Sequence, residues 1–246
     1  MIPATSTSYQ IYAMKLKLQI SNYKLSLIAV FAAVWAWSAI SPNHFDGWVL
    51  ENILVLIFVP IVLLTGFYFR LSDLSYTLIT VFMILHVIGS HYTYAEVPFG
   101  FVLQDWWGAS RNMYDRLVHF SFGLLFVYPV REVFVRITKV KGFWGYYLPI
   151  ELILSFAGFY EIIEWIVARI VDPHAGLAFL GAQGDIWDAQ KDMVLAVIGA
   201  TVTMFIFLLI NMKYNPNFKQ EFKESLKIPK DDHPLGEEKL KKWKWF

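Results

Sequence analysis

Six runs of mostly apolar residues dominate the chain, separated by more polar connections of which the longest is the predicted loop 93–114. A helix that crosses a bilayer needs about 20 apolar residues, and each run is close to that length. The first three runs are almost free of charge, whereas the last three carry acidic and basic residues. The pattern predicts an all-α bundle of six transmembrane helices. They cover residues 24–41, 50–70, 74–92, 115–137, 146–170 and 191–212.

Lysine and arginine are distributed unevenly between the predicted connections. Basic residues fall in the N-terminal tail, in the second-to-third and fourth-to-fifth connections, and in the C-terminal tail, which holds nine lysines. With six spans these segments share one side, and cytoplasmic loops are the ones enriched in lysine and arginine. Both termini are therefore expected in the cytoplasm. The chain divides into a cytoplasmic tail (1–23), a transmembrane domain (24–212) and a second cytoplasmic tail (213–246).

The composition supports a membrane protein and excludes several function classes. Hydrophobic residues make up 57% of the 246 residues, above the roughly 45–50% of soluble domains. A formal net charge of +1 gives no broad basic surface for nucleic acid. The absence of cysteine excludes disulfides, thiolate metal ligands and a cysteine nucleophile. Membrane lipids are the expected partners.

Charged side chains gather at the extracytoplasmic ends of the fourth and fifth spans. Asp115 and His119 are four residues apart and share a helix face. Asp115 is either a helix cap paired with an arginine, or a metal ligand or orienting partner of His119. Glu161 and Glu164 also share a face, but they lie where the helix dipole disfavours anions. This pair requires protonation, a cationic neighbour or a metal.

Three aspartates, Asp185, Asp188 and Asp192, mark the start of the sixth span, and their spacing places them on one helical stripe. The ordinary interpretation makes Asp185 the N-cap and places Asp188 in the first turn, where anions are favoured. Asp192 lies one turn deeper and needs a partner such as Lys191 or an arginine. Gly184 permits a tight turn before the helix.

The extracytoplasmic cluster contains six acids but only four bases, which are Arg111, Arg116, Arg169 and Lys191. Excess negative charge at low dielectric is relieved by protonation or by bound cations. Carboxylates with histidine suit Zn²⁺, Mn²⁺, Fe²⁺ or Mg²⁺. His91, at the end of the third span, is a further candidate, although a hydrogen bond at the membrane interface is its ordinary interpretation. The candidate metal ligands are Asp115, His119, Glu161, Glu164, Asp185, Asp188, Asp192 and His91.

Four segments carry a family resemblance: HYTYAEVPFG (91–100), RNMYDRLVHF (111–120), YEIIEW (160–165) and FLGAQGDIWDAQKDM (179–193). They resemble the YjdF-like bacterial inner-membrane proteins, a family of unknown function, and the resemblance covers about residues 50–212. It implies a multi-pass protein of the bacterial inner membrane.

A more distant similarity, to the VanZ-like family, rests on four positions. These are Asp115, His119, Glu161 and a late aspartate, Asp188 or Asp192. It implies that the four side chains form one site, and it supplies no reaction.

Two classes of function fit these observations. In the first, the chain is an enzyme whose carboxylate–histidine site, with or without a divalent metal, hydrolyses or transfers a lipid or lipid-linked head group at the extracytoplasmic face. His119 or Glu164 is then the general base, and Arg111 or Arg116 holds a phosphate. In the second, the chain is not an enzyme. The acids form the proton or cation relay of a small transporter, or a structural core that holds a partner or lipid.

Overall fold

The computed structural model describes residues 21–171 and 182–227, and every regular element within them is a helix. The outer parts of both predicted tails lie outside these residues. The helices are α2 (Asn22–Ser38), α3 (Phe45–Tyr68), α4 (Asp73–Tyr92), η1 (Tyr94–Glu96), α5 (Pro98–Trp107), α6 (Tyr114–Val133), η2 (Phe134–Thr138), α7 (Trp144–Ile170), α9 (Asp188–Tyr214) and α10 (Phe218–Ser225).

Each predicted span corresponds to one long helix whose ends differ from the prediction by a few residues. Among the described residues, α3, α4, α6 together with η2, and α9 are long and apolar enough to cross a membrane. The described part of α2 has 17 residues, and α7 carries acidic residues along its length. The all-helical class is confirmed for the described part of the chain, whereas six crossings and the side of the termini stay predictions.

The segment 93–114, expected to be a loop, contains the short helices η1 and α5, so that expectation was wrong. Pro98 occupies the first turn of α5, and Gly108 ends the helix with a left-handed φ of 60°. Proline at the start and glycine past the end are the usual boundaries of a helix. Trp106 and Trp107 close α5 as exposed side chains, which is typical of an element at the membrane interface.

Large apolar side chains cover the outer faces of the bundle. Leu56 and Leu64 on α3 and Phe205 and Leu209 on α9 are about half exposed. A soluble monomer rarely exposes apolar patches of such extent. Lipid is the natural cover for these faces.

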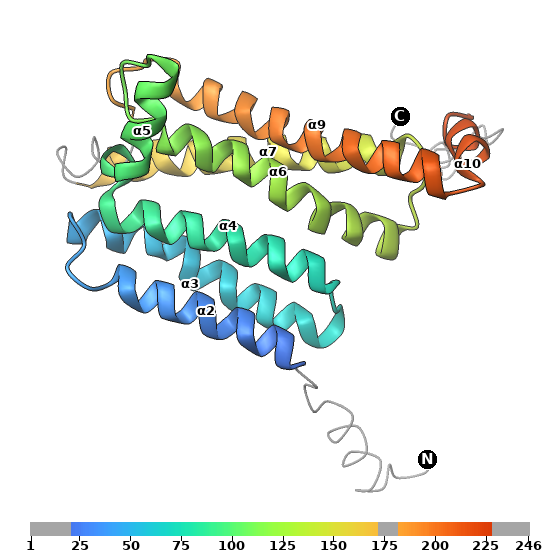
Figure 1. The fold of residues 1–246 in the computed structure, drawn as a ribbon, viewed down its shortest axis with the longest axis horizontal. Helices are drawn as coiled ribbons and strands as arrows, with labels where there is room; N and C mark the ends of the chain where they lie inside the picture. The colour runs from blue at the N-terminus through green and yellow to red at the C-terminus, as the bar shows by residue number, and fades with distance from the viewer. Residues whose placement is uncertain (1–20, 172–181, 228–246) are drawn as a thin grey trace, which may run out of the picture.

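The long helices run side by side as two groups (Figure 1). The first group contains α2, α3 and α4, and the second contains α6, α7 and α9; α4 packs against α6 and joins the groups. Helix α5 lies at one end of the bundle, next to the start of α9, and we call this the site end. Helix α10 and the start of α2 lie at the opposite end (Figure 1).

Helices α6 and α9 approach each other closely at two glycines. A Cβ atom on Gly123 would lie 1.7 Å from the carbonyl oxygen of Ala196, and one on Gly199 would lie 2.2 Å from that of Phe120. Small residues at such crossings let helix backbones touch. Gly158 on α7 is not at such a crossing, because its Cβ would meet only the Met193 sulfur at 3.4 Å.

A block of aromatic rings fills the middle of the bundle between the two groups. The Phe82 and Phe126 rings meet edge to face with centroids 4.9 Å apart, and Phe58 and Phe122 each lie within 5.5 Å of the Phe126 centroid. Along α3, α4 and α6, these rings lie about one or two helical turns from the polar residues at the site end. They are displaced toward the opposite end of the bundle. The block therefore separates the polar end of the interior from the rest.

Candidate functional site

The segments before α6 and α9 are clamped together at the site end. Gln183 Oε1 accepts a hydrogen bond from the Asn112 backbone N–H at 3.0 Å, and Gln183 Nε2 donates to the Asn112 carbonyl at 3.3 Å. The Asn112 side chain donates to the Val97 carbonyl and accepts from the Tyr114 N–H, both at 3.0 Å. Gly184, with φ 85°, makes the predicted tight turn before α9. The starts of α5, α6 and α9 are thus fixed relative to one another.

Arg116 is the centre of the ionic contacts between α6 and α9. Its guanidinium forms ion pairs with Asp192, with Asp188 at 2.5 Å and with Asp185 at 3.2 Å. The predicted aspartate stripe therefore faces one buried arginine. Asp192 has its cationic partner in Arg116, while Lys191 pairs with Asp185 instead. Buried charges are stable only when paired in this way.

Arg111 extends the same ionic contacts. It donates to Asp188, to Asp115 at 3.3 Å and to the Ala182 carbonyl at 3.2 Å. Asp115 does not cap α6, because Met113 is the N-cap residue and Asp115 lies in the first turn. The expected pairing of Asp115 with an arginine is confirmed. Asp188 lies between two guanidinium groups and ties them together.

Asp185 stands at the outer rim, and the expectation that it caps α9 was wrong. The N-cap position is occupied by Trp187, and α9 begins at Asp188. Asp185 Oδ1 accepts from the Trp187 N–H at 3.1 Å, and Oδ2 accepts from Lys191 Nζ at 2.6 Å. The Lys191 ammonium and this N–H lower the pKa of the Asp185 carboxyl. Asp185 is therefore ionised at neutral pH and serves the ionic contacts.

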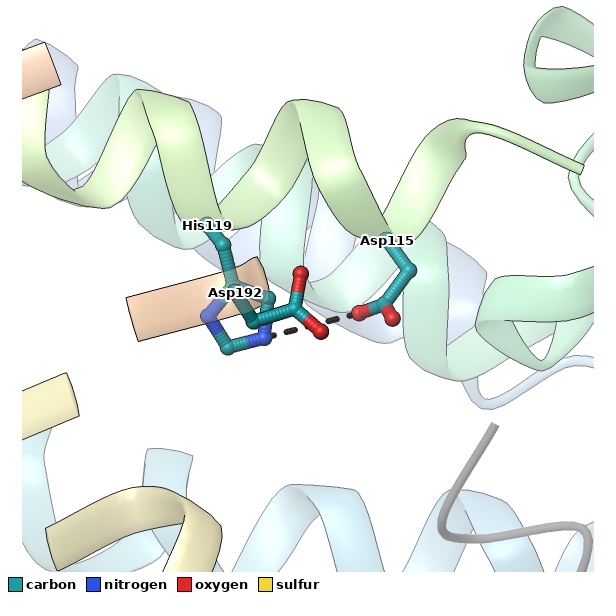
Figure 2. A group of neighbouring side chains, drawn as sticks. All are labelled: Asp115, His119 and Asp192. Atoms are coloured by element: carbon teal, nitrogen blue, oxygen red, sulfur yellow. Dashed lines mark ion pairs between the residues drawn. The ribbon is translucent and has the colours of Figure 1, made fainter. Parts of the chain in front are cut away.

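Below this rim, side chains from three helices converge on His119. His119 Nε2 lies 3.5 Å from Asp115 Oδ1 and 3.7 Å from Glu161 Oε1, which belongs to α7. Asp115, His119 and Asp192 each offer one ligand atom, and these atoms all lie within 4.8 Å of one another. Figure 2 shows the Asp192 carboxylate beside the His119 ring, with Asp115 pointing toward the same space. The structure therefore brings Asp115, His119, Glu161 and Asp192 together, as the sequence predicted.

Two carboxylate oxygens at this point are buried without a hydrogen-bond partner, Asp192 Oδ1 and Glu161 Oε1. Asp192 is only 2% exposed, and its second oxygen is held by Arg116. Leaving a buried polar group unsatisfied costs about 1–3 kcal/mol, and more when the group is charged. These two oxygens therefore have the capacity to take a cation or a proton.

The cations of the site are directed to the aspartates and not to the glutamates. Among the described residues, the ion pairs of Arg111, Arg116 and Lys191 all go to aspartates. Glu161 has His119 as its basic neighbour at 3.7 Å. Neither glutamate forms a direct ion pair with an arginine or lysine of the described residues, so the unfavourable helix dipole still calls for protonation of the pair or for a metal.

Glu164 lies on the wall of a cavity of about 440 Å³ that opens between α3, α4, α6 and α7. Asp115, His119 and Asp192, with their potential metal-ligand atoms, are called the donor group below. Asp115 and His119 line the same cavity, so the donor group borders it. Most of the remaining wall is aromatic or aliphatic. The polar wall residues are Glu51, His86, Tyr94, Asp115, His119, Tyr160 and Glu164.

Four of these wall residues form a hydrogen-bond network that the sequence analysis did not identify as part of a site. The Tyr160 hydroxyl donates to Glu51 Oε2 at 3.1 Å. His86 Nε2 lies 3.2 Å from the Glu51 carbonyl oxygen and must donate to it, so Nδ1 accepts from the Tyr94 hydroxyl at 2.5 Å. Burial raises the pKa of Tyr94 well above its usual value. The sequence did hold a signal for Glu51, because it is the one acidic residue in the predicted span 50–70.

His91 is a predicted ligand that lies away from this group. Its Nδ1 lies 3.1 Å from the Ser38 carbonyl oxygen, and its ring packs on Trp37 at 4.4 Å. It therefore joins α4 to the end of α2, as its ordinary interpretation predicted. Asp185 and Asp188 are not members of the group either; Arg116 binds one carboxylate oxygen of each.

Comparison with known proteins places the whole site inside a matched region. The family model described as predicted membrane protein (DUF2238) matches residues 23–213. The inner membrane protein YjdF of Escherichia coli (strain K12) is 39% identical over 192 residues, which cover 78% of this chain and 88% of that protein. No solved structure matches the chain. The predicted resemblance to YjdF-like proteins is confirmed, and the distant similarity to VanZ-like proteins stays a prediction.

Proposed function

The chain belongs to the DUF2238 family of predicted membrane proteins, and we propose that it is a bacterial inner-membrane enzyme that holds one divalent cation and acts on a lipid or lipid-linked head group. One observation carries this proposal. Asp192 is 2% exposed and leaves an oxygen without a partner beside Asp115 and His119. Carboxylates with one imidazole, and no sulfur, suit Zn²⁺, Mn²⁺, Fe²⁺ or Mg²⁺.

The proposal includes a topology of six crossings with both termini in the cytoplasm. The start of α2 and helix α10 lie at the same end of the bundle, opposite α5 (Figure 1). The basic residues of the chain fall mainly in the segments predicted at that end, as cytoplasmic segments require. The site end then faces the extracytoplasmic side, where it meets the head groups of the outer leaflet.

Each side chain of the site has a distinct task in this proposal. Asp115, His119 and Asp192 hold the cation, and Glu161 completes the set with its unpartnered oxygen. A bound divalent ion would polarise a phosphoryl or carbonyl oxygen and lower the pKa of a bound water. Glu164, on the cavity wall, is the general base that takes the proton of the attacking hydroxyl or water.

The two arginines act through the aspartates they hold. Arg116 and Arg111 fix Asp192, Asp188 and Asp115 by ion pairs. These contacts favour a positioning role for both arginines. Phosphate binding by one of the two arginines stays a prediction.

The non-enzymatic alternatives differ in how well they fit. A transporter needs a polar route across the bundle. The aromatic block formed by Phe58, Phe82, Phe122 and Phe126 interrupts such a route, because these rings line the cavity beyond its polar residues. The arginine–aspartate pairs do favour a structural role for the rim of the site. A purely structural role would leave Asp192 Oδ1 unexplained, since it has no partner to stabilise.

Elemental analysis of the purified protein in mild detergent tests the proposal. We expect about one divalent ion per chain, a lower melting temperature after chelation, and loss of the ion in Asp192→Asn. Asp185→Asn is the matched control, because Asp185 belongs to the same segment but pairs with Lys191 at the rim, and it should retain the ion. No stoichiometric ion, together with unchanged stability in chelator, would contradict the proposal.

A further inference from the structure

The cavity beside the donor group has one polar end and one apolar end. Its ionisable and phenolic residues lie in η1 or toward the site end of α3, α4, α6 and α7. Further along the same helices, the wall consists of Phe58, Ile61, Phe82, Met83 and Phe126. The volume of about 440 Å³ falls within the roughly 300–1,000 Å³ of small-molecule sites. Such a division matches an amphiphile with a polar head and a hydrocarbon tail.

The cavity also has a side opening toward the outer face of the bundle. Helix α3 supplies one edge through Ile61, and α7 supplies the other through Phe159 and Ile163. These three side chains are between half and two-thirds exposed although they line the cavity. A polar hydrogen bond, from Tyr160 to Glu51, spans the two edges at the site end. The opening therefore faces the region that the exposed apolar helix faces assign to lipid.

We infer that this cavity takes a hydrocarbon chain of a membrane lipid, which enters sideways between α3 and α7 and brings the lipid head to Asp115, His119 and Glu164. The inference rests on the proposed function and names its substrate class as a membrane lipid bound by its tail. The aromatic block limits how deep the chain reaches. The rest of the lipid stays in the bilayer through the side opening.

Neighbouring isoleucines on α7 provide a matched pair of variants. Ile163 lines the cavity and is 52% exposed, whereas Ile162 is 53% exposed and lies outside the lining. Ile163→Trp narrows the opening, and Ile162→Trp places the same ring on the outer surface. A second pair on α3, Ile61→Trp and Ile57→Trp, repeats the comparison on the other edge. This second pair keeps the test decisive if one variant does not fold.

The probe is phosphatidylglycerol with a photoactivatable diazirine midway along one acyl chain. The full chain is reconstituted in liposomes of phosphatidylethanolamine and phosphatidylglycerol that contain this probe, and cross-links are mapped by mass spectrometry. Val118 and Phe82 line the cavity and are buried, so a lipid tail reaches them only from inside it. We expect cross-links at both positions, at least five-fold weaker in Ile163→Trp and Ile61→Trp and unchanged in the two controls.

Metal content is measured in the same samples, so that failure of the proposed metal site can be distinguished from failure of the proposed lipid cavity. Cross-links at Val118 and Phe82 without a bound ion leave the lipid cavity standing and contradict the metal site. A bound ion with cross-links confined to outer faces such as that of α9 overturns the cavity inference alone. Equal loss of cross-linking in Ile163→Trp and Ile162→Trp also overturns it.

Discussion

The α6–α9 contact and the α3–α7 side are built in opposite ways. Between α6 and α9, two glycines bring the backbones together and buried arginines bind aspartates across the contact. Between α3 and α7 lies a cavity, with the Tyr160–Glu51 hydrogen bond across its polar end. The tightly packed contact holds the donor group in position. The open side gives a substrate a way to reach it.

The largest effect is expected when the ionic centre of the closed contact is removed. Arg116→Met leaves the buried carboxylate of Asp192 without its arginine and removes one of the two arginines that bind Asp188. Breaking a buried pair in this way costs about 3–5 kcal/mol. Denaturant unfolding in mild detergent measures this loss in the free energy of unfolding.

Lys191→Met is the control for that experiment. Lys191 also pairs with an aspartate, Asp185, but its side chain is 55% exposed. Exposed ion pairs contribute little to stability, so the variant should unfold much like the wild type. Equal losses in the free energy of unfolding for the two variants would show that the buried ion pairs do not hold α6 against α9.

A smaller loss is expected from a methyl group at the glycine crossing. In Gly123→Ala the new Cβ would lie 1.7 Å from the Ala196 carbonyl oxygen, so the helices must move apart. Overpacking of this kind costs about 1–3 kcal/mol. Gly158→Ala, whose Cβ finds the flexible Met193 side chain at 3.4 Å, should leave the melting temperature unchanged or raise it. Equal melting temperatures for Gly123→Ala and Gly158→Ala would contradict the close approach of α6 and α9 at Gly123.

The smallest effect is expected on the open side. Tyr160→Phe removes the hydrogen bond to Glu51 and should lower the free energy of unfolding by about 1 kcal/mol. Tyr128→Phe, on a ring that stacks on Phe207, controls for the loss of a hydroxyl in the same bundle. A loss for Tyr160→Phe as large as that for Arg116→Met would mean that the open side is a principal support of the fold.

The sequence predicted the helices well because apolar runs of membrane length leave few alternatives to a helix. It missed α5, since a helix of ten residues is too short to produce such a run. For the site, the four-residue spacing of Asp115 and His119 and the placement of Glu161 identified one face of each helix, and the structure brings these faces together.

The sequence could not specify which groups meet across different helices. The pairing of Arg116 with three aspartates depends on how α6 and α9 are rotated about their axes. Glu51 joins the cavity because α3 packs on α4 at a particular height, which no local pattern encodes. His91 does not join the donor group because its side chain points toward the Ser38 carbonyl of α2.

The proposed function depends on a cation held by one histidine and by carboxylates from three helices. X-ray absorption on the purified protein loaded with Zn²⁺ reads this ligand shell directly. We expect oxygen and nitrogen ligands only, with the outer-shell signal of a single imidazole that is absent in His119→Gln and present in His91→Gln. A shell without imidazole, or an imidazole signal that survives in His119→Gln, would contradict it.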